Sequence, residues 1–204
     1  MRTKFKQWAV DYLDEHPEVV IEKFDFNLSF FKQKLNIEIG SGKGDFIVTL
    51  SQKRKCENFI AVERVRTVAG IMCKKIVESK IENVRIFPND FQLAIDSIPN
   101  ESFDNIYLNF VDPWPKKRHE KRRLTYPKFL EQYYRILKKD GHLIFKSDND
   151  GLYEYSVEQF EASKFKVLLK EFDYKSDLEN DAVTEYEAKF RSRNQKIHRI
   201  IVTK

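Results

Sequence analysis

Short apolar runs of strand length alternate along this chain with segments of helical periodicity, and this alternation restricts the fold more than any other feature. Five runs have the length and composition of buried strands: Leu35–Ile39, Phe59–Val62, Val84–Phe87, Phe103–Phe110 and His142–Lys146. After the second run, apolar residues repeat at helical spacing in Val65, Val68, Ala69, Met72 and Ile76. Strands that alternate with helices pair in parallel, so the sequence predicts a doubly wound α/β sheet.

The remaining segments complete this sheet. Further helices are predicted at residues 45–52, 91–95, 126–137, 152–162 and 184–193, and two last strands at Lys166–Phe172 and Ile197–Thr203. Lys138 and Lys139 are expected in the last turn of the helix that begins near Tyr126, with Gly141 as its stop. No clear crossover joins the two last strands, so the final strand is expected to be antiparallel.

Length and composition favour a single soluble domain. The chain has 204 residues, read here as one domain, 1–204, in which residues 1–30 form a basic N-terminal arm and helix. Cys56 and Cys73 lack metal-type spacing, as do the four histidines, which predicts a reduced cytoplasmic protein without a metal site. No apolar run approaches the roughly 18 residues of a membrane span, so no membrane association is expected. The net charge of +5 suggests an anionic partner.

A glycine-rich loop follows the first predicted strand, in the order Gly40-Ser41-Gly42-Lys43-Gly44. Glycines at alternate positions permit a tight turn and the close approach of a ligand to the backbone. The G-x-G-x-G spacing is neither the dinucleotide fingerprint nor a phosphate-binding Walker loop. A turn that only closes the corner between strand and helix is the alternative. Lys43 is expected to face solvent without a role.

Acidic residues stand at the ends of the first three strands: Glu38, Glu63 and Asp90. A carboxylate after the second strand suits paired ribose hydroxyls, and Asp90 can accept a hydrogen bond from the amine of adenine. Carboxylates also favour a cationic ligand. S-adenosyl-L-methionine combines a ribose, an adenine and a sulfonium cation, so the sequence predicts this cofactor.

A stiff turn, Asp112-Pro113-Trp114-Pro115, follows the fourth strand. Each proline fixes its own φ and restricts the residue before it. Ligands of doubly wound sheets bind beyond the carboxyl ends of the strands, so this turn is expected at the rim of the site. It is similar to the Asp/Asn-Pro-Pro-aromatic motif of methyltransferases that act on nucleobases. A base taken out of its stack would meet a carboxylate and an aromatic face there.

Six basic side chains then occur within eight positions: Lys116, Lys117, Arg118, Lys121, Arg122 and Arg123. Such a strip beside a base pocket suits phosphate contacts. A solvated basic turn is the alternative reading.

Four blocks in order along the chain resemble the bacterial tRNA (guanine-N7-)-methyltransferases: EIGSGKG, YLNFVDPWPKKRHEKRRLTYPKFL, FKSDNDGLYEYS and TEYEAKF. The start, MRTKFKQWA, is also similar, although Gln7 replaces a frequent proline and Asp150 a frequently basic residue. The resemblance implies a Rossmann-like class I fold that binds S-adenosyl-L-methionine. It also implies methylation of N7 of a guanine in the tRNA variable loop, at position 46 in tRNA numbering.

The resemblance further implies roles for individual residues. Cofactor contacts would come from Glu38, Gly40, Gly42, Gly44, Glu63, Asp90 and Asp112, with Asp112 also as the catalytic residue. Substrate contacts would come from Lys116, Asp148, Thr184, Glu185, Tyr186 and Glu187. The segment Lys117, Arg118, His119, Glu120, Lys121, Arg122 and Arg123 would meet RNA. By its pattern alone, Thr184 with Glu187 is a helix capping box.

Guanine N7 carries a free lone pair, so its methylation needs alignment rather than a general base. Asp148 and Glu187 are expected to accept hydrogen bonds from the guanine edge, which adenine would not satisfy. Two alternatives remain open. One is an adenine-amino methyltransferase acting on RNA or DNA, and the other is a non-catalytic RNA-binding protein with the same fold. A monomer and a homodimer are both compatible with the sequence.

Overall fold

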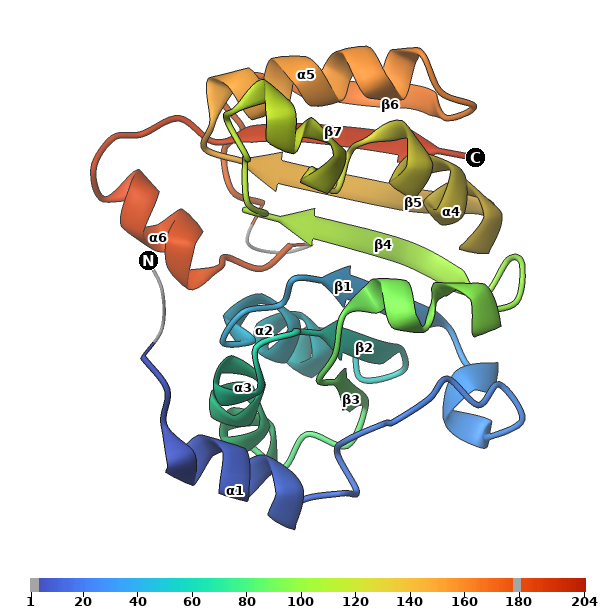
Figure 1. The fold of residues 1–204 in the computed structure, drawn as a ribbon, viewed down its shortest axis with the longest axis vertical. Coiled ribbons are helices and arrows are strands. Elements are labelled where there is room, and N and C mark those ends of the chain that lie inside the picture. The colour runs from blue at the N-terminus through green and yellow to red at the C-terminus, as the bar shows by residue number, and fades with distance from the viewer. Residues whose placement is uncertain (1–3, 178–180) are drawn as a thin grey trace.

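The computed structural model describes residues 4–177 and 181–204, in which seven strands form one sheet with helices on both faces (Figure 1). Residues 1–3 of the expected N-terminal arm lie outside the described residues. The strands are β1 (Leu35–Ile39), β2 (Asn58–Val62), β3 (Val84–Phe87), β4 (Phe103–Asn109), β5 (Leu137–Ser147), β6 (Lys166–Glu171) and β7 (His198–Thr203). Their order in the sheet is β3-β2-β1-β4-β5-β7-β6.

Pairing within the sheet confirms the predicted doubly wound topology. The first five strands pair in parallel, whereas β7 is antiparallel to both β5 and β6. The chain passes from β3, at one edge, back across to β4 beside β1, so strand order reverses there. The carboxyl ends of the parallel strands therefore meet at one end of the sheet, where such folds bind ligands.

Helices cover both faces of the sheet and create two hydrophobic cores. The α-helices are α1 (Gln7–Glu15), α2 (Asp45–Lys53), α3 (Arg66–Glu78), α4 (Pro127–Ile136), α5 (Asp150–Glu161) and α6 (Glu185–Arg191). One core joins α4 and α5 to the sheet, and the other joins α1, α2 and α3 to its opposite face.

No helix among the described residues combines the length and apolar character needed to cross a membrane.

The junction between α4 and β5 differs from the sequence prediction. The helix ends at Ile136, and the strand begins directly at Leu137, so Lys138 and Lys139 lie in β5 rather than in a helical turn. Leu137 is fully buried and pairs with Phe103 of β4, which stabilises the extended conformation. Gly141 is not a helix stop, because it lies within β5, where an added Cβ would approach the Asp104 carbonyl oxygen to 2.8 Å.

Two other boundaries also differ. The fourth strand ends at Asn109, because Phe110 adopts a left-handed φ of 50° and turns the chain. The helix expected at residues 91–95 is replaced by two 3₁₀ turns, Phe91–Leu93 and Ile95–Ser97. Two further 3₁₀ segments are η1 (Ser29–Lys32) and η4 (Lys117–Arg122), the latter in the basic strip.

Candidate active site

The glycine loop connects β1 to α2, and its three glycines all have left-handed backbone angles. They differ in how crowded their surroundings are. A Cβ added at Gly42 would meet nothing within 4 Å, whereas one at Gly44 would lie 2.4 Å from Met72 Cγ on α3. Gly42 therefore leaves the loop open, while Gly44 is required for the close packing of α2 against α3.

Three predicted acids come together at the carboxyl ends of β1, β2 and β4. Glu63 accepts hydrogen bonds from the backbone N–H groups of Gly42 (3.1 Å) and Val65 (2.8 Å). Burial raises the pKa of Glu63, and the nearby Asp112 carboxylate raises it further. Glu63 in turn raises the pKa of Glu38. We call these three residues, Glu38, Glu63 and Asp112, the carboxylate notch.

Asn109 is a neighbour of the notch that the sequence reasoning missed. Its Nδ2 donates to Glu38 Oε1 at 2.8 Å, and both side chains are buried. Glu38 Oε2 and Asn109 Oδ1 have no hydrogen-bond partner among the described residues. Burial raises the pKa of Glu38 from its ordinary value of 4.5 to about 7, against the lowering effects of Asn109, Ser41 and Lys146. The notch therefore contains a carboxyl group that titrates near neutrality.

The titration of Glu38 makes the free energy of unfolding depend on pH. The folded protein holds the Glu38 proton more tightly than the unfolded chain, so the stabilisation is complete below pH 4.5 and is lost as pH rises to about 7. The loss amounts to about 3 kcal/mol of unfolding free energy. Glu38→Gln cannot ionise, so we expect this variant to be more stable than the parent at pH 8 and equally stable at pH 4.5.

Urea denaturation of the parent and of Glu38→Gln at both pH values measures this difference. A stability difference that does not change with pH would show that folding does not raise the pKa of Glu38.

The proline turn is held by the basic segment that follows it. Trp114 has a φ of 42°, a strained value for an aromatic residue. Arg123 donates to the Trp114 carbonyl oxygen from Nε (3.4 Å) and Nη2 (3.2 Å), and its guanidinium lies 4.3 Å from the Tyr155 ring centroid. Arg122 lies 4.9 Å from the Trp114 ring. Arg123 therefore stabilises the turn.

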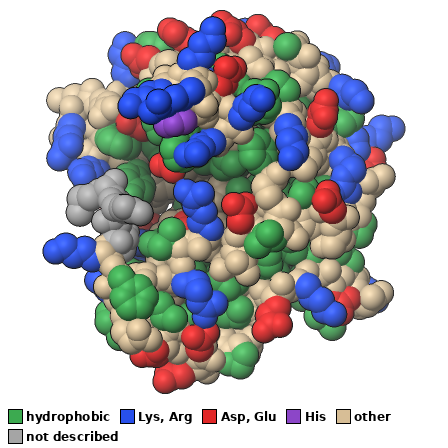
Figure 2. Space-filling view, in the orientation of Figure 1, with side chains coloured by type: hydrophobic (Ala, Val, Ile, Leu, Met, Phe, Trp, Pro, Cys, Tyr) green, Lys and Arg blue, Asp and Glu red, His purple; other side chains and the backbone are tan. Residues whose placement is uncertain are grey.

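The rest of the basic segment is open to solvent. Lys116, Lys117, Arg118, Lys121 and Arg122 are exposed, whereas His119 and Glu120 are half-buried. His119 packs edge-on against Trp114, with ring centroids 5.6 Å apart. Figure 2 shows Lys and Arg side chains gathered over the upper half of this face, around a histidine.

Lys43 is partly exposed to solvent, as the sequence predicts, but it has a partner that the sequence does not indicate. Its Nζ donates to both carboxylate oxygens of Glu185, at 2.9 and 2.8 Å. Glu185 is the first residue of α6, so this ion pair connects the glycine loop to the segment that was expected to contact substrate.

Thr184 caps α6 as predicted, because its Oγ1 accepts from Glu187 N at 2.9 Å.

A buried ionic cluster joins α6 to the end of β5. Lys146 is fully buried, and its Nζ donates to Glu187 Oε2 (3.1 Å), Asp181 Oδ2 (3.0 Å) and the Ala182 carbonyl oxygen (3.1 Å). Glu187 Oε1 accepts from Ser176 and Arg191. Glu187 is fully buried, so it reaches a guanine only if this cluster rearranges.

The other predicted site residues lie around the same rim. Asp148 follows β5, accepts from Gln195 Nε2 at 3.1 Å and has its pKa raised by burial. Tyr186 is exposed on α6, and Asp90 is exposed after β3, where its Oδ1 accepts from Gln92 N. The described residues contain no group of three or more His, Cys, Asp or Glu side chains arranged to hold a metal ion.

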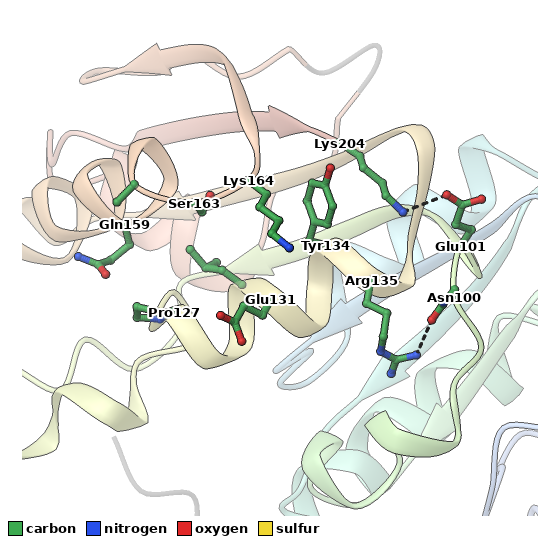
Figure 3. A pocket seen from close by; sticks show the side chains of 12 residues that line it. Asn100, Glu101, Pro127, Glu131, Tyr134, Arg135, Gln159, Ser163, Lys164 and Lys204 are labelled. Atoms are coloured by element: carbon green, nitrogen blue, oxygen red, sulfur yellow. Dashed lines mark hydrogen bonds and ion pairs between the residues drawn. The ribbon is translucent and has the colours of Figure 1, made fainter.

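A cavity of about 960 Å³ lies between α4 and α5, away from the notch (Figure 3). Its lining includes Glu101, which precedes β4, and Lys204, which follows β7, so it lies at the opposite end of the sheet. Lys204 Nζ donates to Glu101 across its edge at 3.0 Å. None of the predicted site residues lines this cavity.

The chain matches one family model and is similar to curated proteins that share one name. Residues 32–200 match a family model described as "Putative methyltransferase". A tRNA (guanine-N(7)-)-methyltransferase of Lactobacillus gasseri is 42% identical over 97% of this chain and 97% of its own length. Proteins of that name from Mycoplasma mycoides and Staphylococcus saprophyticus are each 38% identical, over 99% and 98% of this chain and 98% of their own lengths.

Solved structures share the fold at low identity. A SAM dependent methyltransferase from Aquifex aeolicus is 15% identical, with a TM-score of 0.59 over 98% of both chains. The 16S rRNA methyltransferase KamB is 10% identical, with a TM-score of 0.64 over 90% of this chain and 94% of its own. The long alignments to the curated relatives decide the family: this chain belongs to the tRNA (guanine-N7-)-methyltransferases.

Proposed function

We propose that this protein transfers the methyl group of S-adenosyl-L-methionine to N7 of a guanine in tRNA. The target is the variable-loop guanine at position 46 in tRNA numbering. The observation that carries the proposal is the gathering of Glu38, Glu63 and Asp112 beside the open glycine loop and the stiff Asp-Pro-Trp-Pro turn. The protein acts as a monomer or a homodimer in the cytoplasm.

The residues of the notch fit this cofactor. Gly42 leaves its side of the loop open, and Glu63, held by two backbone N–H groups, retains lone pairs for ribose hydroxyls. Asp90 follows β3, the next strand, and is assigned to the adenine amine. Ionised carboxylates at this position favour a cationic ligand, and a bound cation in turn favours the ionised form of Glu38. When bound, S-adenosyl-L-methionine supplies a methyl group on a positively charged sulfur.

We place Asp112 at the rim of the notch, beside the purine that accepts the methyl group. Pro113 and Pro115 fix the backbone around it, so the carboxylate needs little reorganisation when substrate arrives. As guanine N7 accepts the methyl group, positive charge develops on the purine ring, and a preset carboxylate stabilises that charge. No residue has to remove a proton from N7, which explains why the notch needs no histidine.

The preference for guanine over adenine depends on hydrogen-bond acceptors that follow the carboxyl end of β5. Guanine presents N1–H and an amine, and Asp148 offers a half-buried carboxylate to them. Adenine lacks a proton at N1 and would leave this half-buried acceptor without that hydrogen bond, which disfavours adenine. Lys116 and Tyr186 are exposed and are assigned to contacts with the substrate.

The experiment incubates purified protein with labelled cofactor and unmodified tRNA, digests the RNA, and separates the nucleosides by chromatography. Label in 7-methylguanosine supports the proposal. Label in a methylated adenosine would support the adenine-amino alternative, and cofactor binding without transfer would support the non-catalytic one.

The exposed part of the basic strip is expected to bind tRNA phosphates. Lys117→Ala with Arg118→Ala removes two exposed charges that are not bonded to the proline turn. We expect this double variant to bind tRNA more weakly and to reduce the slope of log affinity against log salt by about 1 to 2. Filter binding at several salt concentrations measures both. An unchanged slope would mean that the strip is only solvated.

A further inference from the structure

Trp8 is a large aromatic residue that lies at the surface and has no part in the site described above. It is 45% exposed, and Phe5 and Val65 nearby in the fold are 70% and 44% exposed. Lys4 and Lys6 are also exposed in the same segment. We call these five residues, Lys4, Phe5, Lys6, Trp8 and Val65, the Trp8 platform. Exposed aromatic groups beside basic residues are typical of binding surfaces.

The packing of α1 holds Trp8 in this exposed position. The helix buries Ala9 and Leu13, and its backbone lies so close to α3 that a Cβ at Gly70 would approach the Ala9 carbonyl oxygen to 1.7 Å. The Lys6 N–H donates to Thr67 Oγ1 at 3.4 Å. Because α1 is fixed on α3 by its opposite face, the Trp8 ring stays at the surface without a need for ligand-induced folding.

Two lysines lie over the Trp8 ring. The Nζ atoms of Lys6 and Lys74 are 5.8 and 5.4 Å from its centroid. Nucleic-acid-binding proteins stack bases on aromatic rings of this kind and place cations near the adjoining phosphates. A protein partner would not require the lysines, so the combination of ring and charge favours a nucleic acid.

The platform is continuous with the carboxylate notch. Val65 N donates to Glu63 Oε1, and Thr67, two residues further, holds the backbone of Lys6. Figure 1 shows the segment that leads into α1 on the side of the molecule where α6 and the arrowheads of β4 and β5 lie. The basic strip follows β4, on the other side of β1, so the notch lies between the two basic surfaces.

We propose that the Trp8 platform is a second contact surface for the tRNA substrate, on which an unpaired base stacks on Trp8 while phosphates meet Lys4 and Lys6. This inference rests on the proposed function, because it requires tRNA to be the substrate. The inference adds that the RNA extends across the notch and contacts both the Trp8 platform and the basic strip.

Fluorescence tests the stacking directly. The chain has two tryptophans, Trp8 and Trp114, so Trp114→Phe leaves Trp8 as the only one. We expect unmodified tRNA to quench the emission of this variant and to protect it from acrylamide. Emission that stays constant while filter binding shows a complex would overturn the inference and leave the proposed function intact. A parent protein that binds no tRNA would contradict both.

Affinity provides a second measurement with a matched control. Trp8→Ala should weaken tRNA binding about tenfold, with Trp8→Phe close to the parent. Lys6→Ala should also weaken it. Lys164 is the control, since it too is an exposed lysine over a ring, 6.0 Å from the Tyr134 centroid, but at the cavity of Figure 3.

The affinity of each variant for S-adenosyl-L-methionine separates recognition from structure. We expect it to stay at the parent value in Trp8→Ala and Lys6→Ala. Equal tRNA affinities for Lys6→Ala and Lys164→Ala, or a parallel loss of cofactor binding in Trp8→Ala, would show that the platform only supports the fold.

Discussion

Replacing Asp112 with alanine is expected to lower the rate of methyl transfer by about a thousandfold or more while tRNA still binds. In the proposed reaction, positive charge develops on the guanine beside this carboxylate. Pro113 and Pro115, which follow Asp112, restrict the turn without help from its side chain, so the fold should survive the substitution. Single-turnover rates with saturating cofactor and tRNA measure the effect on the chemical step.

Two further variants make this result specific. Asp112→Asn keeps the size of the side chain and removes its charge, so a similar loss in both variants assigns the effect to charge. Asp96→Ala removes an exposed carboxylate in the crossover between β3 and β4 and should leave the rate unchanged. Near-normal turnover in Asp112→Ala would leave the aspartate only a role in the turn.

Replacing Lys146 with methionine is expected to destabilise the fold by about 4 kcal/mol. The ammonium group is fully buried, and its removal leaves the buried Glu187 and the largely buried Asp181 without their shared cation. The anchor of α6 on β5 is lost with it, so we also expect a higher KM for tRNA. Urea denaturation gives the stability change, and steady-state kinetics give the KM.

Lys138 on the same strand is the matched control. It pairs with Asp104 at 2.7 Å, but its side chain is 40% exposed, so Lys138→Met should cost about 1 kcal/mol or less. Adding Glu187→Gln to Lys146→Met should recover part of the loss, because it removes a buried charge that has lost Lys146 and keeps only Arg191 as its cation among the described residues. If Lys146→Met and Lys138→Met were equally mild, the cluster would not anchor α6.

The sheet was largely predictable from the sequence, because its signal is local. Buried strands such as β1 and β3 are short apolar runs between turn residues, and their bounds match the prediction. The α4–β5 junction was not predictable, because the helical pattern runs directly into the strand at Leu137. There the pairing with Phe103, a tertiary contact, decides the conformation.

The site, like the sheet, has one part that the sequence predicts and another that it does not. The acids at the strand ends were predictable because parallel strands bring their carboxyl ends together. The Lys43–Glu185 pair joins residues 142 positions apart, and the Lys146–Glu187 pair joins residues 41 apart. No local pattern marks such partners. Asn109 had one available signal, a polar residue near the end of an apolar strand, but only the structure shows it bonded to Glu38.

The most direct test of the proposed chemistry uses tRNA in which the variable-loop guanine is replaced by 7-deazaguanine, which has carbon in place of N7. The cofactor, the notch and the RNA contacts are unchanged, so only the acceptor atom is missing. Transfer of labelled methyl groups to ordinary tRNA and none to the 7-deaza tRNA is the predicted result. Equal labelling of both tRNAs would place the methyl group on another atom and contradict the assignment.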